Sequence, residues 1–159
     1  MTINSDTPAS GPLPPRWFIR TAWKVHKALY RWTGARFGLR APRVDRYGLA
    51  YLTTTGRRSG AERSVMIGYF EQGNGIVTMA MNGWGAPEPA WWLNLQSKPE
   101  ALLAMTGGVI VPVVARRATG EERERLWERW RQLDSGLEGY AGRRPTETAV
   151  VVLDRRLDT

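Results

Sequence analysis

The chain has no cysteine and a single histidine, His26, among its 159 residues. Disulfides and thiolate-bound metals are therefore excluded, and we expect no histidine-based metal site or catalytic triad. No apolar run approaches the roughly 20 residues that a membrane-spanning helix needs, and the N-terminal stretch lacks the basic-then-apolar pattern of a signal peptide. These absences predict a cytoplasmic protein, and the length is typical of one folded domain.

Acidic residues are scarce in the N-terminal part, and the net charge of +8 is concentrated there. Residues 1–46 hold nine Lys and Arg against Asp6 and Asp45, a local charge of +7, whereas the rest of the chain is close to neutral. Compact RNA-binding signatures, such as an aromatic RNP box or a GXXG loop beside a helix, are not evident. Because the excess charge belongs to one segment, we expect no nucleic-acid partner.

Three segments follow from the composition: 1–15, 16–46 and 47–159. The first is rich in Pro, Ser and Gly and is expected to be disordered. The second is predicted to be a basic amphipathic helix, ended near Gly34, and a linker. The apolar side of that helix comprises Phe18, Ala22, Val25, Leu29 and Trp32. This side could pack on the protein's own domain, or residues 16–33 could lie on an anionic membrane surface at the inner face of the membrane.

From Leu49 onward, short β-type runs alternate with turn sequences. Strands are predicted over 49–55, 63–71, 76–81, 101–105, 109–116 and 149–153, with hairpin turns at 72–75 and 106–108. Helices are predicted over 90–96 and 120–133, the second with Thr119 as N-cap and Glu122 completing a capping box. Most connections are too short for parallel crossovers. The pattern therefore predicts the α+β class, an antiparallel sheet or barrel with peripheral helices.

The most informative stretch for function is LAYLTTTGRRSGAER, between Leu49 and Arg63. A strand ends at Gly56, and the turn that follows presents two arginines before Ser59-Gly60. Turn amides and guanidiniums are donors suited to phosphate or carboxylate. No Gly-Lys-Ser/Thr sequence follows, so this is not a P-loop. The pattern predicts an anion-binding turn, with an arginine-rich turn that holds no ligand as the alternative.

Four segments together resemble the deazaflavin-dependent nitroreductase family: LTTTGRRSG, AMNGWGAPEPAWWLNLQSKPEA, ATGEERERLWERW and TAVVVLD. They occur in the family's order and spacing, from about Tyr47 to Asp154. The resemblance implies an antiparallel split β-barrel of the FMN-binding type that binds coenzyme F420. It also implies hydride transfer from C5 of the reduced deazaflavin to an organic acceptor. The cofactor carries that chemistry, so the resemblance names no catalytic side chain.

The resemblance also implies which residues hold the cofactor. By this resemblance, the residues that bind the phosphate and the acidic tail of F420 are Arg57, Arg58, Ser59, Gly60 and Arg63. The deazaflavin ring is expected to lie beside Ala80, Met81, Asn82 and Gly83. Trp91, in the segment PAWWLN, is expected to support or flank the cofactor, with an ordinary core tryptophan as the alternative.

On the acceptor side the chain departs from the family. Gly68 stands where nitro- and quinone-reducing members have a tyrosine, Met81 stands for a ring-facing serine, and Trp84 replaces a glycine. Of three C-terminal tyrosines, only Tyr140 is kept. We therefore predict that Gly68, Trp84 and Tyr140 border an acceptor site that is more apolar and differently shaped, for a quinone-, nitro- or enone-like molecule.

Two other functions stay open at this point. The same barrel could hold FMN, heme or a lipid without this chemistry, or the basic segment 1–46 could make the protein a membrane-surface module. Fold analogy also favours a homodimer.

Overall fold

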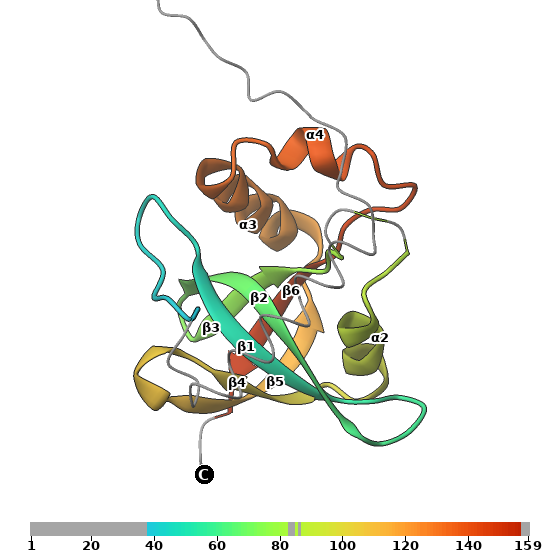
Figure 1. Cartoon of the computed structure of the whole chain (residues 1–159). Coiled ribbons are helices and arrows are strands. Elements are labelled where there is room, and N and C mark those ends of the chain that lie inside the picture. Colours follow the sequence, from blue (N-terminus) through green and yellow to red (C-terminus); the bar gives the residue numbers. More distant parts are fainter. Residues whose placement is uncertain (1–37, 83–84, 86, 157–159) are drawn as a thin grey trace, which may run out of the picture.

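The computed structural model in Figure 1 describes residues 38–82, 85 and 87–156. Its elements are β1 (Gly48–Thr55), β2 (Glu62–Gln72), β3 (Gly75–Met79), α2 (Ala90–Ser97), β4 (Glu100–Ala104), η1 (Thr106–Gly108), β5 (Ile110–Arg117), α3 (Gly120–Leu133), α4 (Leu137–Ala141) and β6 (Val150–Arg155). The predicted disordered segment 1–15 and the predicted helix 16–33 lie outside the described residues, as do Gly83 and Trp84.

The six strands close into an antiparallel barrel in the order β1-β2-β3-β6-β5-β4. Three pairings are hairpins between strands that follow each other in the chain, namely β1–β2, β2–β3 and β4–β5. The barrel is completed by β1 with β4, β3 with β6 and β5 with β6, each antiparallel. Closure pairs every strand on both sides and removes exposed sheet edges. The predicted α+β fold with an antiparallel split barrel is confirmed.

The apolar run of β6 reflects burial on both faces of the strand. Val151 and Leu153 point into the barrel core, whereas Val150 and Val152 belong to a second cluster outside it. Such two-sided burial replaces polar–apolar alternation with a continuous apolar run.

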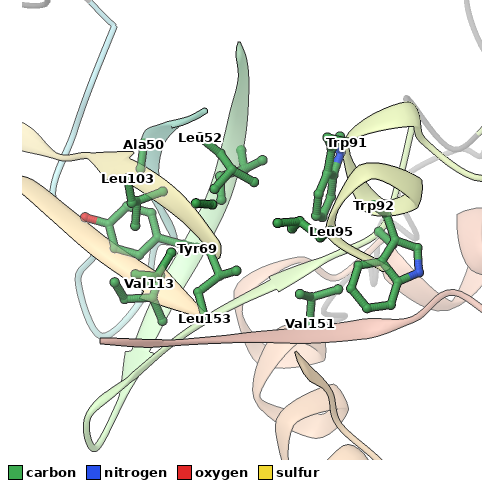
Figure 2. Close-up of a cluster of buried hydrophobic side chains, with 14 of the residues drawn as sticks. Ala50, Leu52, Tyr69, Trp91, Trp92, Leu95, Leu103, Val113, Val151 and Leu153 are labelled. Atoms are coloured by element: carbon green, nitrogen blue, oxygen red, sulfur yellow. The ribbon is translucent and has the colours of Figure 1, made fainter. Parts of the chain in front are cut away.

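The helices occupy two places around the barrel. α3 and α4 lie together over one side of it, while α2 lies separately on another side (Figure 1). Leu126 and Trp130 of α3 and Leu137 of α4 pack on Val150 and Val152 of β6. In Figure 2, Trp91, Trp92 and Leu95 of α2 lie beside Leu52 and Val151 of the barrel interior, and all five belong to one buried cluster. We call these two groups the α3 cluster and the barrel core.

The start of α3 was predicted correctly, but the capping box was wrong. Thr119 is the N-cap and makes no side-chain capping bond. The Glu122 carboxylate instead accepts two hydrogen bonds from the Arg116 guanidinium, at 2.7 and 2.9 Å, and Arg116 also donates to Asp154 at 2.7 Å. Paired charge-assisted bonds outcompete a single bond to a neutral backbone N–H. The same contacts hold the pKa of Glu122 below its usual range.

Candidate cofactor-binding site

The arginine turn between β1 and β2 is closed by its own backbone. The Gly56 N–H donates to the Ala61 carbonyl at 2.7 Å, and the Gly60 N–H donates to the Gly56 carbonyl at 2.8 Å. The Ala61 N–H donates to the Ser59 hydroxyl at 3.2 Å. Gly60 has a φ of 69°, which glycine adopts without steric cost. The turn is therefore formed before any ligand arrives.

The side chains of Arg57 and Arg58 on this turn, and of Arg63 at the start of β2, are exposed. Within the described ranges, no carboxylate pairs with any of these three guanidiniums. By contrast, six other arginines form ion pairs: Arg116, Arg117, Arg123, Arg131, Arg144 and Arg155. Unpaired guanidiniums on a preformed turn can bind a phosphate or carboxylate without first giving up a partner.

One buried amide attaches the turn to α2. The Asn94 Oδ1 atom accepts a hydrogen bond from the Arg57 N–H at 3.1 Å, and its Nδ2 group donates to the Thr54 hydroxyl at 3.1 Å. The Thr54 hydroxyl in turn donates to the Arg63 carbonyl at 3.3 Å. The arginine turn and the helix that carries Trp91 are thus joined directly.

The residues expected beside the deazaflavin ring follow β3. Ala80 is fully buried, its N–H donates to the Ala149 carbonyl at 2.9 Å, and its carbonyl accepts from Arg144 at 3.0 Å. Met81 and Asn82 are half-buried, and Met81 packs against the α3 cluster. These residues lead through the loop to Pro89, the N-cap of α2. One helix therefore adjoins both predicted parts of the site.

Trp91 lies within the barrel core, with 7% of its surface exposed. Its ring meets that of Trp92 edge to face, with centroids 6.4 Å apart. Its role as a wall beside the cofactor stays a prediction, because its main contacts are with the core.

The predicted acceptor positions lie in different surroundings. Gly68 is buried, and a Cβ atom built there would lie 3.0 Å from the ring of Tyr47 and 3.6 Å from Trp130. Tyr140 is half-buried on α4, and the Arg143 guanidinium lies 5.8 Å from the centroid of its ring. Gly68 and Met81 both adjoin the α3 cluster, whereas Trp84 lies outside the described residues. The aromatic side chains of Tyr47 and Trp130 therefore occupy the space beside Gly68.

The residues present fit an elongated ligand with an anionic end. The arginine turn supplies unpaired cationic donors and is hydrogen-bonded to Asn94 of α2, and Ala80, which follows β3, shares the barrel core with Trp91 of that helix. In the described part of the chain, no group of three His, Asp or Glu residues is arranged to hold a metal ion. None of the described helices is long and apolar enough to cross a bilayer.

Comparison with known proteins supplies the family. Residues 22–155 match the sequence profile of the F420H(2)-dependent quinone reductase family. The chain belongs to this family. The match confirms the resemblance found in the sequence, the assignment as an oxidoreductase and coenzyme F420 as the cofactor.

Individual relatives agree with the family match. An F420H(2)-dependent quinone reductase of Mycobacterium tuberculosis is 28% identical over 136 residues, which cover 84% of this chain and 89% of that protein. A solved F420-H2 dependent reductase, FDR-A, has a TM-score of 0.60 at 25% identity and covers 67% of this chain and 93% of its own. A heme binding protein from Mycobacterium smegmatis shares the fold alone, with a TM-score of 0.52 at 18% identity over 69% of this chain and 46% of that one.

Two residues that organise the site, Asn94 and Arg144, were assigned no role from the sequence. Asn94 entered the prediction only as the last residue of the segment PAWWLN, and the local signal for its role is a polar residue on the buried side of a short helix. Nothing local marks Arg144, whose side chain is fully buried and is held by Ala80, Glu88 and Thr148. Its partners come from distant parts of the chain, so only the fold reveals it.

Proposed function

We propose that this oxidoreductase reduces a quinone-like organic acceptor with F420H2. The observation that carries the proposal is the preformed turn, attached to α2, with the unpaired Arg57 and Arg58 on it and Arg63 beside it on β2. When bound, reduced F420 supplies a hydride from C5, and the acceptor gains that hydride and one proton to become a hydroquinone. The protein's own contribution is to bind, orient and exclude water.

Each part of the site has a distinct role in this proposal. Arg57, Arg58 and Arg63 bind the phosphate and acidic tail, together with the free turn amides of Arg58 and Ser59, while Gly60 shapes the turn. Ala80, Met81 and Asn82 would border the ring and Trp91 would support the cofactor from α2, while Gly83, which the resemblance also assigns to the ring, lies outside the described residues. The proton comes from solvent, and no described side chain is assigned the role of acid.

A quinone is favoured over a nitro compound by two observations. The M. tuberculosis relative is named a quinone reductase, and the acceptor side is apolar here. Met81, half-buried against the α3 cluster, supplies apolar side-chain surface, while Tyr140, half-buried on α4, carries a hydroxyl. A flat apolar ring with two carbonyl oxygens suits such surroundings.

The test is reoxidation of reduced F420 by a soluble quinone, followed through the cofactor's visible absorbance. We expect turnover with the quinone and at least tenfold slower turnover with a nitroarene of similar size. Equal or faster reduction of the nitroarene would contradict the acceptor assignment. A reaction that proceeds equally well without protein would refute catalysis.

Three further expectations stay predictions. Light scattering of the full chain tests the homodimer. Co-sedimentation with anionic liposomes, compared between the wild type and a Lys24→Glu/Lys27→Glu variant, tests membrane contact through residues 16–33. A visible spectrum of protein purified from its own host tests the alternative ligands FMN and heme.

A further inference from the structure

We propose that Asn94 is a positioning residue that holds the arginine turn in its ligand-binding orientation and fixes its distance from Trp91. The ligand concerned is the anionic end of the cofactor, so this inference rests on the proposed function. Asn94 itself need not touch the cofactor.

An asparagine at this place has a structural cost. It lies inside the eight-residue helix α2 and is only 4% exposed. Asparagine is a weak helix former, and a buried amide without partners loses its hydrogen bonds to water. A leucine would suit the same position better on both counts. The amide is therefore explained by its partners, which all belong to the arginine turn and its flanking strands.

The backbone N–H groups of the turn differ in whether they already have a hydrogen-bond acceptor. The Arg57 N–H is directed at Asn94 Oδ1 and is not available to a ligand. Among the described residues, the N–H groups of Arg58 and Ser59 have no acceptor. The Arg57 amide thus anchors the turn, and the next two amides, together with the guanidiniums, are left for an anion.

A second bond makes the anchor rigid. Asn94 Nδ2 donates to the Thr54 hydroxyl, which donates to the Arg63 carbonyl on the opposite strand. The amide is therefore tied to both strands that flank the turn. Trp91 lies three residues before Asn94, on the same side of α2. Movement of the turn relative to the expected ring site would break these bonds.

The experiment compares Asn94→Ala and Thr54→Val with two controls on the same elements. Thr53→Val removes a neighbouring hydroxyl of β1 that contacts only Ser64, at 3.0 Å, and Gln96→Ala alters the exposed side of α2. Amide hydrogen exchange by NMR on the ligand-free full chain reports the anchor at Arg57. Fluorescence titration with F420 reports the affinity.

We expect exchange at the Arg57 amide to accelerate at least tenfold in Asn94→Ala and less in Thr54→Val, with both controls unchanged. The Kd for F420 should rise about tenfold in Asn94→Ala, the equivalent of one or two neutral hydrogen bonds, while kcat at saturating F420 changes less than twofold. Asn94→Asp should restore slow exchange at Arg57, because its carboxylate still accepts that N–H. It should not restore affinity, because the new charge repels the anion.

Unchanged exchange at Arg57 in both Asn94→Ala and Thr54→Val would overturn the positioning role. So would a Kd in these variants equal to that of Gln96→Ala, or full affinity in Asn94→Asp. A wild type that fails to bind F420 while Arg57 exchange still responds to Asn94→Ala would refute the proposed function instead. The two failures are therefore distinguishable.

Discussion

At the scale of single residues, Gly68 lies on β2 where two aromatic rings cover the strand. Its Cα faces Tyr47 and Trp130, whose rings lie 5.7 Å apart between centroids and cover the strand. A larger side chain at position 68 would have to displace this pair. The departure noticed in the sequence is thus accompanied by aromatic side chains that fill the space.

Gly68→Ala should lower the free energy of unfolding by about 1 to 2 kcal/mol, because the added methyl group overpacks a filled site. Its Cβ would lie 3.0 and 3.2 Å from two ring atoms of Tyr47. In a Tyr47→Ala background the same change should cost less, and urea denaturation of the four proteins measures the coupling. Additive effects would show that Tyr47 is not the obstacle.

Tyr69 gives a prediction for alkaline pH. It is 1% exposed, and burial, assisted by the nearby charge of Glu71, raises its pKa to about 12. The unfolded chain releases this proton near pH 10 while the folded chain keeps it, so stability is complete below pH 10 and falls as pH rises toward 12. Between pH 8 and 11.5 the free energy of unfolding should therefore fall by about 1 to 3 kcal/mol less in Tyr69→Phe than in the wild type. Urea denaturation at pH 8, 10 and 11.5 measures this difference. An identical pH dependence in both proteins would contradict the assignment.

At the scale of elements, the buried Arg144 joins three segments. Its guanidinium donates to the Ala80 carbonyl at 3.0 Å, to the Thr148 hydroxyl at 2.8 Å and to Glu88 at 3.1 Å. The Arg144 side chain is fully buried, whereas that of Glu88 is 29% exposed. The pair therefore holds the loop before α2 and the segment before β6 against the end of β3.

Arg144→Met should cost about 3 kcal/mol or more of unfolding free energy, because it leaves the Ala80 carbonyl without its side-chain donor and the Glu88 carboxylate without its cationic partner. Arg117→Met is the matched control. Arg117 pairs with Glu147, and their side chains are 45% and 58% exposed, respectively. Such an exposed ion pair should contribute less than about 1 kcal/mol. Chemical denaturation checks both, and similar losses in the two variants would show that the buried pair is not special.

The sequence predicted the elements better than their connections. Strand positions, the hairpin turns and α3 follow from local apolar patterns and turn residues, which act over a few positions. The Arg116 contact with Asp154, 38 residues away, and the Asn94 anchor depend on residues far apart in the chain, and the five-residue helix α4 depends on packing; Arg116 reaches Glu122 from the preceding strand, outside the capping-box spacing. Local patterns carry no information on such pairs, which explains why the capping box was wrong and α4 was missed.

At the scale of the whole molecule, the barrel and the family assignment could be predicted, and the site only in part. The arginine turn was predicted from its own residues, and the structure shows it preformed and free of ion pairs. Gly83 and Trp84 lie outside the described residues, and the roles of Trp91 and Tyr140 stay predictions. The fold adds what sequence could not supply, namely the Asn94 bonds that join α2 to the turn and the Arg144 bonds that join the end of β3 to the loop before α2.

The central claim is that the arginine turn binds the anionic part of F420, and titration of the cofactor through its fluorescence tests it most directly. The wild type is compared at low and high salt with Arg57→Ala/Arg58→Ala and with Arg125→Ala/Arg131→Ala, a control of equal charge on α3. We predict a wild-type Kd below about 100 μM, roughly −5.5 kcal/mol, and a Kd at least tenfold higher and less salt-dependent in the turn variant only. Absence of wild-type binding in this range, or equal affinity of the turn variant and the α3 control, would contradict the account.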